Sequence, residues 1–259
     1  ALRLGCAYNI FDGIELLEYS IKSIRTSVDF ICVIYQDISN FGNSSKIDSF
    51  SLLNKMKDAG LIDEIVKYIP NTSLKGHGNE IAKRNLGLVT CKNHTCTHFM
   101  TIDCDEFYIK DQFDAAKKRI IEGGFDSSAC QMQTYYKVPE VCLNPPEAYY
   151  VPFIYRIDER KFDIGTKWPV IADPTRRLLP KNILIFDRSE LEMHHYSYVR
   201  MDIRTKLLNS SANTNFLSRI EEIAKHHDNW TDGDKALLAG KEKRLYDTKK
   251  VENYFKIKL

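Results

Sequence analysis

The sequence has no apolar run long enough to cross a membrane. The longest apolar runs, such as Phe30 to Tyr35, extend over six residues, whereas a membrane-spanning helix needs about 20. The first residues, from Ala1 to Tyr8, have the pattern of a strand and lack the charged-then-apolar pattern of a signal peptide. We therefore expect neither a transmembrane segment nor a targeting segment in this chain.

An excess of charge of either sign is also lacking. Lys and Arg number 37 against 35 Asp and Glu, which leaves a formal net charge of +2. Proteins that bind nucleic acid through its phosphates usually carry a dense basic surface, so we expect no nucleic-acid partner. Hydrophobic residues make up 43% of the 259 residues, which is enough for the core of one large domain or two small ones.

Cysteine is too sparse for a disulfide framework. The chain has seven cysteines, an odd number, and disulfide-stabilised domains are usually shorter and denser in cysteine. This pattern favours a reducing compartment and hence a cytoplasmic protein. Glycosylation sequons of the form Asn-x-Ser/Thr favour the lumen of the secretory pathway instead, and both locations stay open. The sequons begin at Asn43, Asn71, Asn93, Asn209 and Asn229.

Strand and helix patterns alternate four times in the first half of the chain. Four strand-like apolar runs cover residues 2–8, 30–35, 62–69 and 98–102. Each is followed by an amphipathic pattern, starting near Asp12, Ser45, Asn79 and Asp111. In the third of these helices, Ala82, Leu86 and Val89 are expected to face inward. The alternation predicts an α/β fold with a mostly parallel central sheet, and right-handed crossovers would place helices on both of its faces.

The second half of the chain has a different pattern. Strand-like runs joined by proline-rich and charged loops occupy residues 126–196, and the chain reads as helical from about Arg200 onward. We expect one domain over residues 1–206, made of a first half at 1–110 and a second at 111–206. A helical C-terminal segment at 207–259 would follow. Its lysines suit either solvent or a peripheral contact with an anionic membrane surface.

The most informative segment is Asp103-Cys104-Asp105, which follows the fourth strand. Ligands of an open parallel sheet bind beyond the carboxyl ends of its strands, and alternation along a strand puts both aspartates on one side. Two converging carboxylates repel each other unless a cation lies between them, and hard oxygen ligands suit Mg²⁺ or Mn²⁺. The segment therefore predicts a divalent-metal site, with a capping role at the strand end as the alternative.

Residues 99–107, which read Phe-Met-Thr-Ile-Asp-Cys-Asp-Glu-Phe, resemble the Asp-x-Asp-Glu-Phe signature of GT-A-fold glycosyltransferases of the family-2-like group. Three other segments are similar to that family and occur in the same order. They are the first strand, loop and helix (Tyr8-Asn9 and residues 17–24), the basic-Arg-Asn-x-Gly helix at residues 83–87, and the His-containing segment at residues 194–200. The resemblance covers residues 2–206.

The resemblance implies a metal-dependent hexosyltransferase-like enzyme. It would move a sugar from a nucleotide-diphospho-sugar to a hydroxyl of a glycan or lipid-linked acceptor, in surface polysaccharide or lipopolysaccharide synthesis. Asp105 and His195 would bind the metal, Mn²⁺ or Mg²⁺, and Asp103 would share it through water or contact the ribose of the donor. The metal would bridge both phosphates and stabilise the negative charge of the leaving nucleoside diphosphate.

The same resemblance assigns the nucleotide contacts. Asn9 and Asp37, at the ends of the first two strands, would meet the nucleoside. Arg84 would reach toward the diphosphate, and its alternative is a surface pair with Glu80, four residues earlier. The sequence departs from the family at the second strand, where Gln36-Asp37 replaces Asp-Asp. The identity of the nucleotide therefore stays open.

An inverting transferase needs a carboxylate that takes the proton of the acceptor hydroxyl. Asp173 is the first candidate; Arg176, three residues later, could pair with it or bind an anionic acceptor. Glu147 is the second, because tyrosines beside it could hold a sugar ring, and Glu140 and Asp163 are further candidates. A retaining enzyme would need no such base, so the stereochemical outcome stays open, as does the oligomeric state.

Two other classes of function are kept as alternatives. A sugar-phosphate nucleotidyltransferase would need a glycine-rich phosphate loop after the first strand, and the loop from Asn9 to Gly13 has one glycine. A non-catalytic glycan-binding protein of this fold would leave the combination of Asp103, Asp105 and His195 without a purpose. Both observations favour the transferase.

Overall fold

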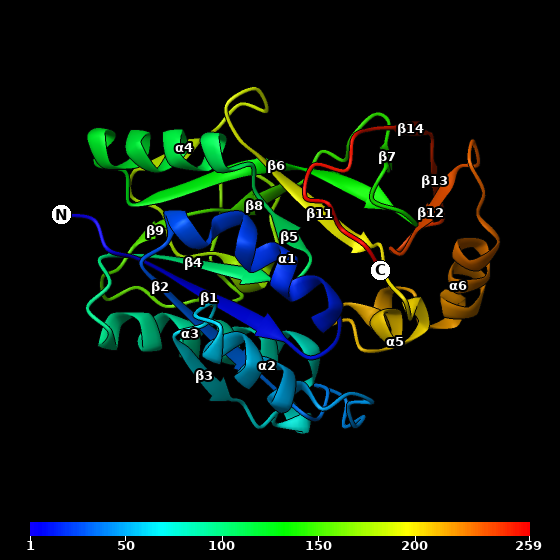
Figure 1. Cartoon of the computed structure of the whole chain (residues 1–259), viewed down its shortest axis with the longest axis horizontal. Coiled ribbons are helices and arrows are strands. Elements are labelled where there is room, and N and C mark those ends of the chain that lie inside the picture. Colours follow the sequence, from blue (N-terminus) through cyan, green and yellow to red (C-terminus); the bar gives the residue numbers. More distant parts are fainter.

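The apolar runs of the first half form a five-stranded sheet in a computed structural model that describes residues 1–259 (Figure 1). Four parallel strands and one short antiparallel edge strand take the order β3-β2-β1-β4-β9. All residues of β1 and β2 are buried, as expected of continuous apolar strands that are covered on both faces. The strands are β1 (Leu4–Ile10), β2 (Phe30–Tyr35), β3 (Glu64–Lys67), β4 (His98–Asp103) and β9 (Tyr155–Arg156).

Helices cover both faces of this sheet. The core on one face contains Tyr8 of β1 together with Ile21 of α1 (Ile14–Ile24) and residues of α2 (Ser49–Asp58) and α4 (Lys110–Gly123). On the other face, Ala7 packs with Leu88 of α3 (Lys75–Asn93). The predicted α/β class, with a mostly parallel sheet between two helical layers, is confirmed.

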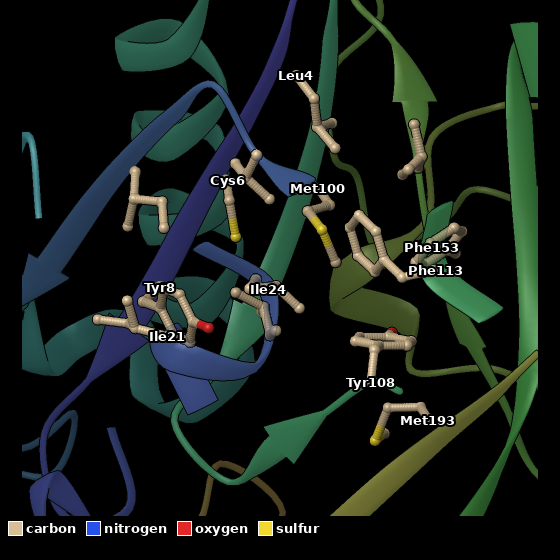
Figure 2. Close-up of a cluster of buried hydrophobic side chains, with 14 of the residues drawn as sticks. Leu4, Cys6, Tyr8, Ile21, Ile24, Met100, Tyr108, Phe113, Phe153 and Met193 are labelled. Atoms are coloured by element: carbon tan, nitrogen blue, oxygen red, sulfur yellow. The ribbon is translucent and has the colours of Figure 1, made fainter. Parts of the chain in front are cut away.

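The second half of the chain forms a second, mixed sheet, which the sequence patterns did not separate from the first. Its order is β14-β7-β6-β11-β5, and β8 and β10 also pair with β6. The side chains between the two sheets form the main core, where Met100 and Cys6 of the first sheet face Phe153, Tyr108 and Met193 (Figure 2). The strands are β5 (Glu106–Phe107), β6 (Ser127–Tyr136), β7 (Val141–Leu143), β8 (Tyr150–Pro152), β10 (Ile183–Ile185), β11 (Glu192–Tyr198) and β14 (Thr248–Lys250).

The C-terminal segment is helical over only part of its length. α5 (Ile203–Leu208) and α6 (Ile220–Asn229) agree with the prediction, but the chain from residue 230 onward forms no helix. It forms β12 (Ala236–Leu238), β13 (Arg244–Tyr246) and β14 instead, because an apolar strand packs under α6 and β14 pairs with β7. The boundary expected after residue 206 falls within α5.

Five 3₁₀ turns connect these elements. They are Arg25–Ser27, Thr72–Leu74, Pro174–Arg176, Asn213–Asn215 and Leu217–Arg219. None of the helices combines the length and the apolar character that crossing a bilayer requires.

α3 buries a different set of residues than its periodicity predicted, although Leu86, expected inward, packs against the core while partly buried. Val89, expected inward, is 49% exposed, whereas Lys83, Arg84 and Gly87 are buried. A Cβ atom at Gly87 would lie 2.6 Å from the Cβ of Ala7, so the glycine lets the helix contact β1 directly. This close contact brings the polar side chains of the same face to the carboxyl edge of the sheet.

Candidate functional site

A polar cavity of about 240 Å³ lies at the carboxyl ends of β1, β2 and β4. Strand ends, α3, β11 and α5 all contribute to it, and only three of its 21 lining residues are hydrophobic. Six of the residues predicted from sequence line this one cavity: Asn9, Arg84, Asp103, Asp105, Asp173 and His195. Most of the candidate side chains therefore lie together at the edge of the sheet where we expected ligands to bind.

Asp37 and Glu147 lie outside the cavity lining. The Asp37 carboxylate pairs with Lys67 Nζ of β3 at 2.7 Å. Gln36, one residue earlier, lines the cavity instead, because successive side chains of an extended segment point to opposite sides. Glu147 accepts a hydrogen bond from Thr134 Oγ1 at 2.7 Å. The nucleoside role of Asp37 and the base role of Glu147 stay predictions, and neither carboxylate is among the residues that line this cavity.

Asp103 ends β4 and faces Arg84 of α3. Arg84 donates from Nη1 to Asp103 Oδ1 at 2.9 Å and from Nη2 to Oδ2 at 3.4 Å. The alternative partner of Arg84, Glu80, is more distant at 3.7 Å. Burial would raise the pKa of the Asp103 carboxyl, but Arg84 and Arg176 hold that pKa below its ordinary value. Asp103 therefore stays ionised, and the guanidinium of Arg84 supplies the positive charge beside it.

Asp105 follows in the turn between β4 and β5 and is 5% exposed. β5 pairs antiparallel with β11, with His195 opposite Glu106, and this pairing brings His195 beside Asp105. His195 Nε2 lies 3.5 Å from Asp105 Oδ1, while Asp105 Oδ2 accepts a hydrogen bond from Arg200 Nη2 at 2.6 Å. Asp105 Oδ1 itself is buried and accepts no hydrogen bond.

The pKa values of this pair move apart. Burial opposes the charged form of Asp105, but His195 and Arg200 hold its pKa well below the ordinary value. Burial would likewise lower the pKa of His195, and the Asp105 carboxylate raises it above the ordinary value. Each group thus stabilises the charged form of the other, and the imidazole is held with Nε2 toward the carboxylate.

Arg200, which the sequence patterns did not single out as a site residue, fits against the start of α1. A Cβ atom at Gly13 would lie 1.8 Å from Arg200 Nη1, so a side chain at this position would displace the guanidinium. Gly13 also has a φ of 74°, a conformation that glycine adopts at no steric cost. The single glycine of the loop after β1 thus leaves the space that the Arg200 guanidinium needs to pair with Asp105.

The sequence led us to expect that Arg176 pairs with Asp173 or faces an acceptor, but its side chain does neither. It is 4% exposed and donates to Glu106 Oε2 at 2.7 Å and to Oε1 at 2.9 Å. Asp173 is exposed at the cavity and its Oδ1 accepts two hydrogen bonds from Thr175, both at 2.8 Å. Asp103, Asp105 and Glu106 are therefore each paired with a different arginine.

The donor set fits a divalent ion at Asp105 and His195. One ligand atom each of Asp105, Glu106 and His195 lies within 4.8 Å of the others, but Arg176 occupies both oxygens of Glu106. Two neighbouring ligands of an octahedral ion at about 2.1 Å are about 3 Å apart, close to the 3.5 Å between Asp105 Oδ1 and His195 Nε2. The unpartnered Asp105 oxygen thus faces an imidazole nitrogen at a separation that one ion can bridge.

The charge of the cavity also suits a cation. Five carboxylates line it, against four lysine and arginine side chains, so the lining carries one net negative charge when His195 is neutral. The nucleoside diphosphate that the sequence resemblance implies would bring further negative charge. A divalent ion between the two would remove most of this repulsion.

His194 lies on the opposite side of β11 from His195. Its Nδ1 is 2.7 Å from Tyr135 Oη, and burial lowers its pKa to about 4 from an ordinary 6.5. Between these two pH values the unfolded chain binds a proton that the folded chain does not, so the free energy of unfolding falls as the pH falls. We expect a loss of about 3 kcal/mol from pH 7 to pH 4 from this residue.

Urea unfolding of the wild type and of His194→Phe across this pH range tests the expectation. The Phe side chain keeps the aromatic packing and cannot titrate, so the free energy of unfolding of the variant should depend less steeply on pH between 6.5 and 4. Equal slopes for the two proteins would show that His194 is not the group responsible.

Comparison with known proteins gives weak likenesses. No protein-family model matches the chain, and no curated protein matches its sequence. Among solved structures, residues 1–349 of S. aureus TarS are 13% identical, with 90% of this chain and 74% of that chain covered and a TM-score of 0.49. GalNAc-T7 with UDP, GalNAc and Mn²⁺ is 12% identical, with 66% and 30% covered and a TM-score of 0.39. Likeness at this level does not place the chain in a family.

Proposed function

We propose that this chain is a metal-dependent glycosyltransferase of GT-A type that uses a nucleotide-diphospho-sugar. The observation that carries the proposal is the Asp105–His195 pair at the carboxyl edge of a parallel sheet. An unpartnered carboxylate oxygen faces an imidazole nitrogen at 3.5 Å, inside a polar cavity with room for a phosphorylated ligand. The resemblance of residues 99–107 to the family signature supports the same assignment.

Asp105 Oδ1 and His195 Nε2 would hold the ion. When bound, the ion supplies positive charge for the diphosphate, which gains negative charge as the sugar leaves. Arg200 fixes the Asp105 carboxylate through its other oxygen. Arg84 fixes Asp103, which leaves Asp103 to act on the donor ribose or through water.

Asn9 and Gln36 are our candidates for nucleoside recognition. Both amide atoms of Asn9 are buried without a hydrogen-bond partner, as is Gln36 Oε1. Gln36 Nε2 is already committed to Ile38 O and Asn40 Oδ1, at 2.7 and 3.0 Å. Buried polar atoms without partners cost free energy, and a nucleoside with donor and acceptor groups would satisfy them.

Asp173 is our candidate for the catalytic base. Only Oδ1 takes part in its hydrogen bonds to Thr175, so Oδ2 is free to accept the proton of an acceptor hydroxyl. The acceptor oxygen would form its bond to the anomeric carbon as the bond from that carbon to the phosphate oxygen breaks. The nucleoside diphosphate leaves with the electron pair, and the proton stays on Asp173. Glu147, which lies outside the cavity lining, stays the second candidate.

We further propose that the acceptor is a glycan or a lipid-linked glycan in surface polysaccharide or lipopolysaccharide synthesis, and that the enzyme works in the cytoplasm. All seven cysteines are unpaired and buried, which suits a reducing compartment. Asn209, the fourth sequon, lines the cavity and accepts a hydrogen bond from Asn43 at 3.0 Å. A glycan on either asparagine would break this contact at the cavity.

Calorimetric titration with UDP, GDP and CMP, each with Mn²⁺ and with EDTA, tests the function. We expect one nucleotide to bind in the presence of Mn²⁺ and at least about tenfold more weakly in EDTA, as the loss of a cation between negative groups requires. Equal affinity with and without metal would remove the metal from the proposal. No binding of any nucleotide would overturn the transferase assignment.

A further inference from the structure

One cationic side chain of the cavity has no carboxylate partner. Lys83 pairs with Glu80 at 2.8 Å, Arg84 with Asp103 at 2.9 Å and Arg200 with Asp105 at 2.6 Å. Lys206 of α5 lines the same cavity, and its ammonium group makes neither an ion pair nor a hydrogen bond in this structure. The Lys206 ammonium group is therefore the one cation of the cavity without a direct ion pair, although the carboxylates of Asp105, Asp12 and Glu147 are close enough to favour its charge.

The position of Lys206 is well fixed without an anion. Its Nζ lies 4.6 Å from the centroid of the Tyr198 ring, a distance at which an ammonium group is attracted to an aromatic face. Tyr198 is anchored because its hydroxyl accepts a hydrogen bond from Ala239 N at 2.8 Å. The backbone of α5 is held by Ile203 and Leu207, both buried in the second core. The ammonium group is thus placed before any ligand arrives.

The surroundings of Lys206 work against its charge. Burial, and after it the nearby Arg200, lower the pKa of Lys206 to about 8, and the carboxylates of Asp105, Asp12 and Glu147 offset only part of this shift. An ammonium group in such a place gains more from an incoming anion than an exposed lysine, because water screens it less. Phosphate oxygens are the anions that the proposed reaction brings to this cavity.

We propose that Lys206 binds the diphosphate of the donor and holds the charge of the nucleoside diphosphate as it leaves. This inference rests on the glycosyltransferase function proposed above. Asp105 and His195 would hold the ion, and Lys206 would donate hydrogen bonds to oxygens of the same diphosphate. The charge on those oxygens grows as the bond to the sugar breaks, so Lys206 would stabilise the transition state more than the bound donor.

Substitution at Lys206 separates this role from simple packing. Lys206→Met keeps the apolar stem on Tyr198 and removes the charge, and Lys206→Arg keeps a charge. Lys206→Gln is a second uncharged variant that does not depend on how well Met packs. Lys57→Met, at an exposed position of α2, is the matched control outside the cavity.

Each protein is titrated calorimetrically with inorganic pyrophosphate and with UDP, GDP and CDP, all in the presence of Mn²⁺. We expect Lys206→Met and Lys206→Gln to weaken binding about tenfold to a hundredfold, the range for loss of a hydrogen bond to a charged group. Lys206→Arg should recover most of the affinity, and Lys57→Met should match the wild type. In steady-state assays with the donor, kcat should fall more than KM rises.

Two results would count against the proposal in different ways. Wild-type affinity in both uncharged variants, with unchanged melting temperatures, would overturn the role of Lys206 and leave the transferase function intact. Failure of the wild type to bind pyrophosphate or any nucleoside diphosphate would overturn both proposals together.

Discussion

Asp105→Asn is expected to abolish metal-dependent nucleotide binding and to lower kcat about a thousandfold. Stabilisation by a metal ion is worth several kcal/mol, and each 1.4 kcal/mol is about a factor of ten. The amide has nearly the size of the carboxylate but lacks the charge that attracts the ion. In the wild type, a carboxylate oxygen lies 3.5 Å from His195 Nε2. The neutral amide that replaces it is a weaker ligand for a divalent cation.

Asp58→Asn is the matched control, because it makes the same chemical change at an exposed position of α2. It should behave as the wild type in Mn²⁺ titration, in turnover and in thermal unfolding. His195→Gln is the second test: the imidazole side chain is 24% exposed, so its loss should disturb the fold little while it weakens metal binding. Retention of Mn²⁺-dependent binding by Asp105→Asn would contradict the metal assignment.

The edge of the sheet that carries the cavity could be predicted because the signal is local. Phe30–Tyr35 is a continuous apolar run, and the structure makes the same six residues a strand that is buried throughout. His98–Asp103 ends where the acidic residues begin. Parallel strands of this kind bring their carboxyl ends to one edge, so Asn9 and Asp103 could be expected to meet before any contact was known.

The arginines that neutralise the acidic cluster could not be assigned in the same way. Arg176 comes from a 3₁₀ turn and Arg200 from the segment after β11, and which acid each one meets depends on how the two sheets pack. Sequence reasoning supplied a metal as the cation that two adjacent aspartates require. In the structure, arginines supply part of that positive charge. The sequence indicates only that a cluster of acidic residues needs positive charge nearby, and it does not indicate which residues supply it.

Two further differences have tertiary causes. The lysine-rich end of the chain has the composition of a helix, yet Thr248–Lys250 completes the edge of the second sheet beside β7, and pairing of this kind overrides local propensity. Asp37 matched the family position, whereas Gln36 lines the cavity. A shift of one residue at the end of a strand exchanges the two sides.

Arg176→Met is expected to destabilise the protein by about 3–5 kcal/mol, the cost of leaving one member of a buried ion pair without its partner. Glu106 is 2% exposed, and Arg176 donates to both of its carboxylate oxygens at 2.7 and 2.9 Å. Without the guanidinium, Glu106 would be a buried charge, or would take up a proton at a cost in free energy. The double variant Glu106→Gln with Arg176→Met should lose less stability than Arg176→Met alone.

Urea unfolding of the single and double variants measures the coupling between the two residues. Arg204→Met is the control, since Arg204 pairs with Glu221 at 2.8 Å and with Asp228 at 2.6 Å on the surface, where each such pair contributes about 1 kcal/mol or less. An equal loss of stability in Arg176→Met and Arg204→Met would contradict the argument. The pair also ties the turn that follows Asp173 to the strand that follows Asp105. Its loss should therefore loosen the proposed base and the proposed metal ligand together, and lower kcat even in protein that remains folded.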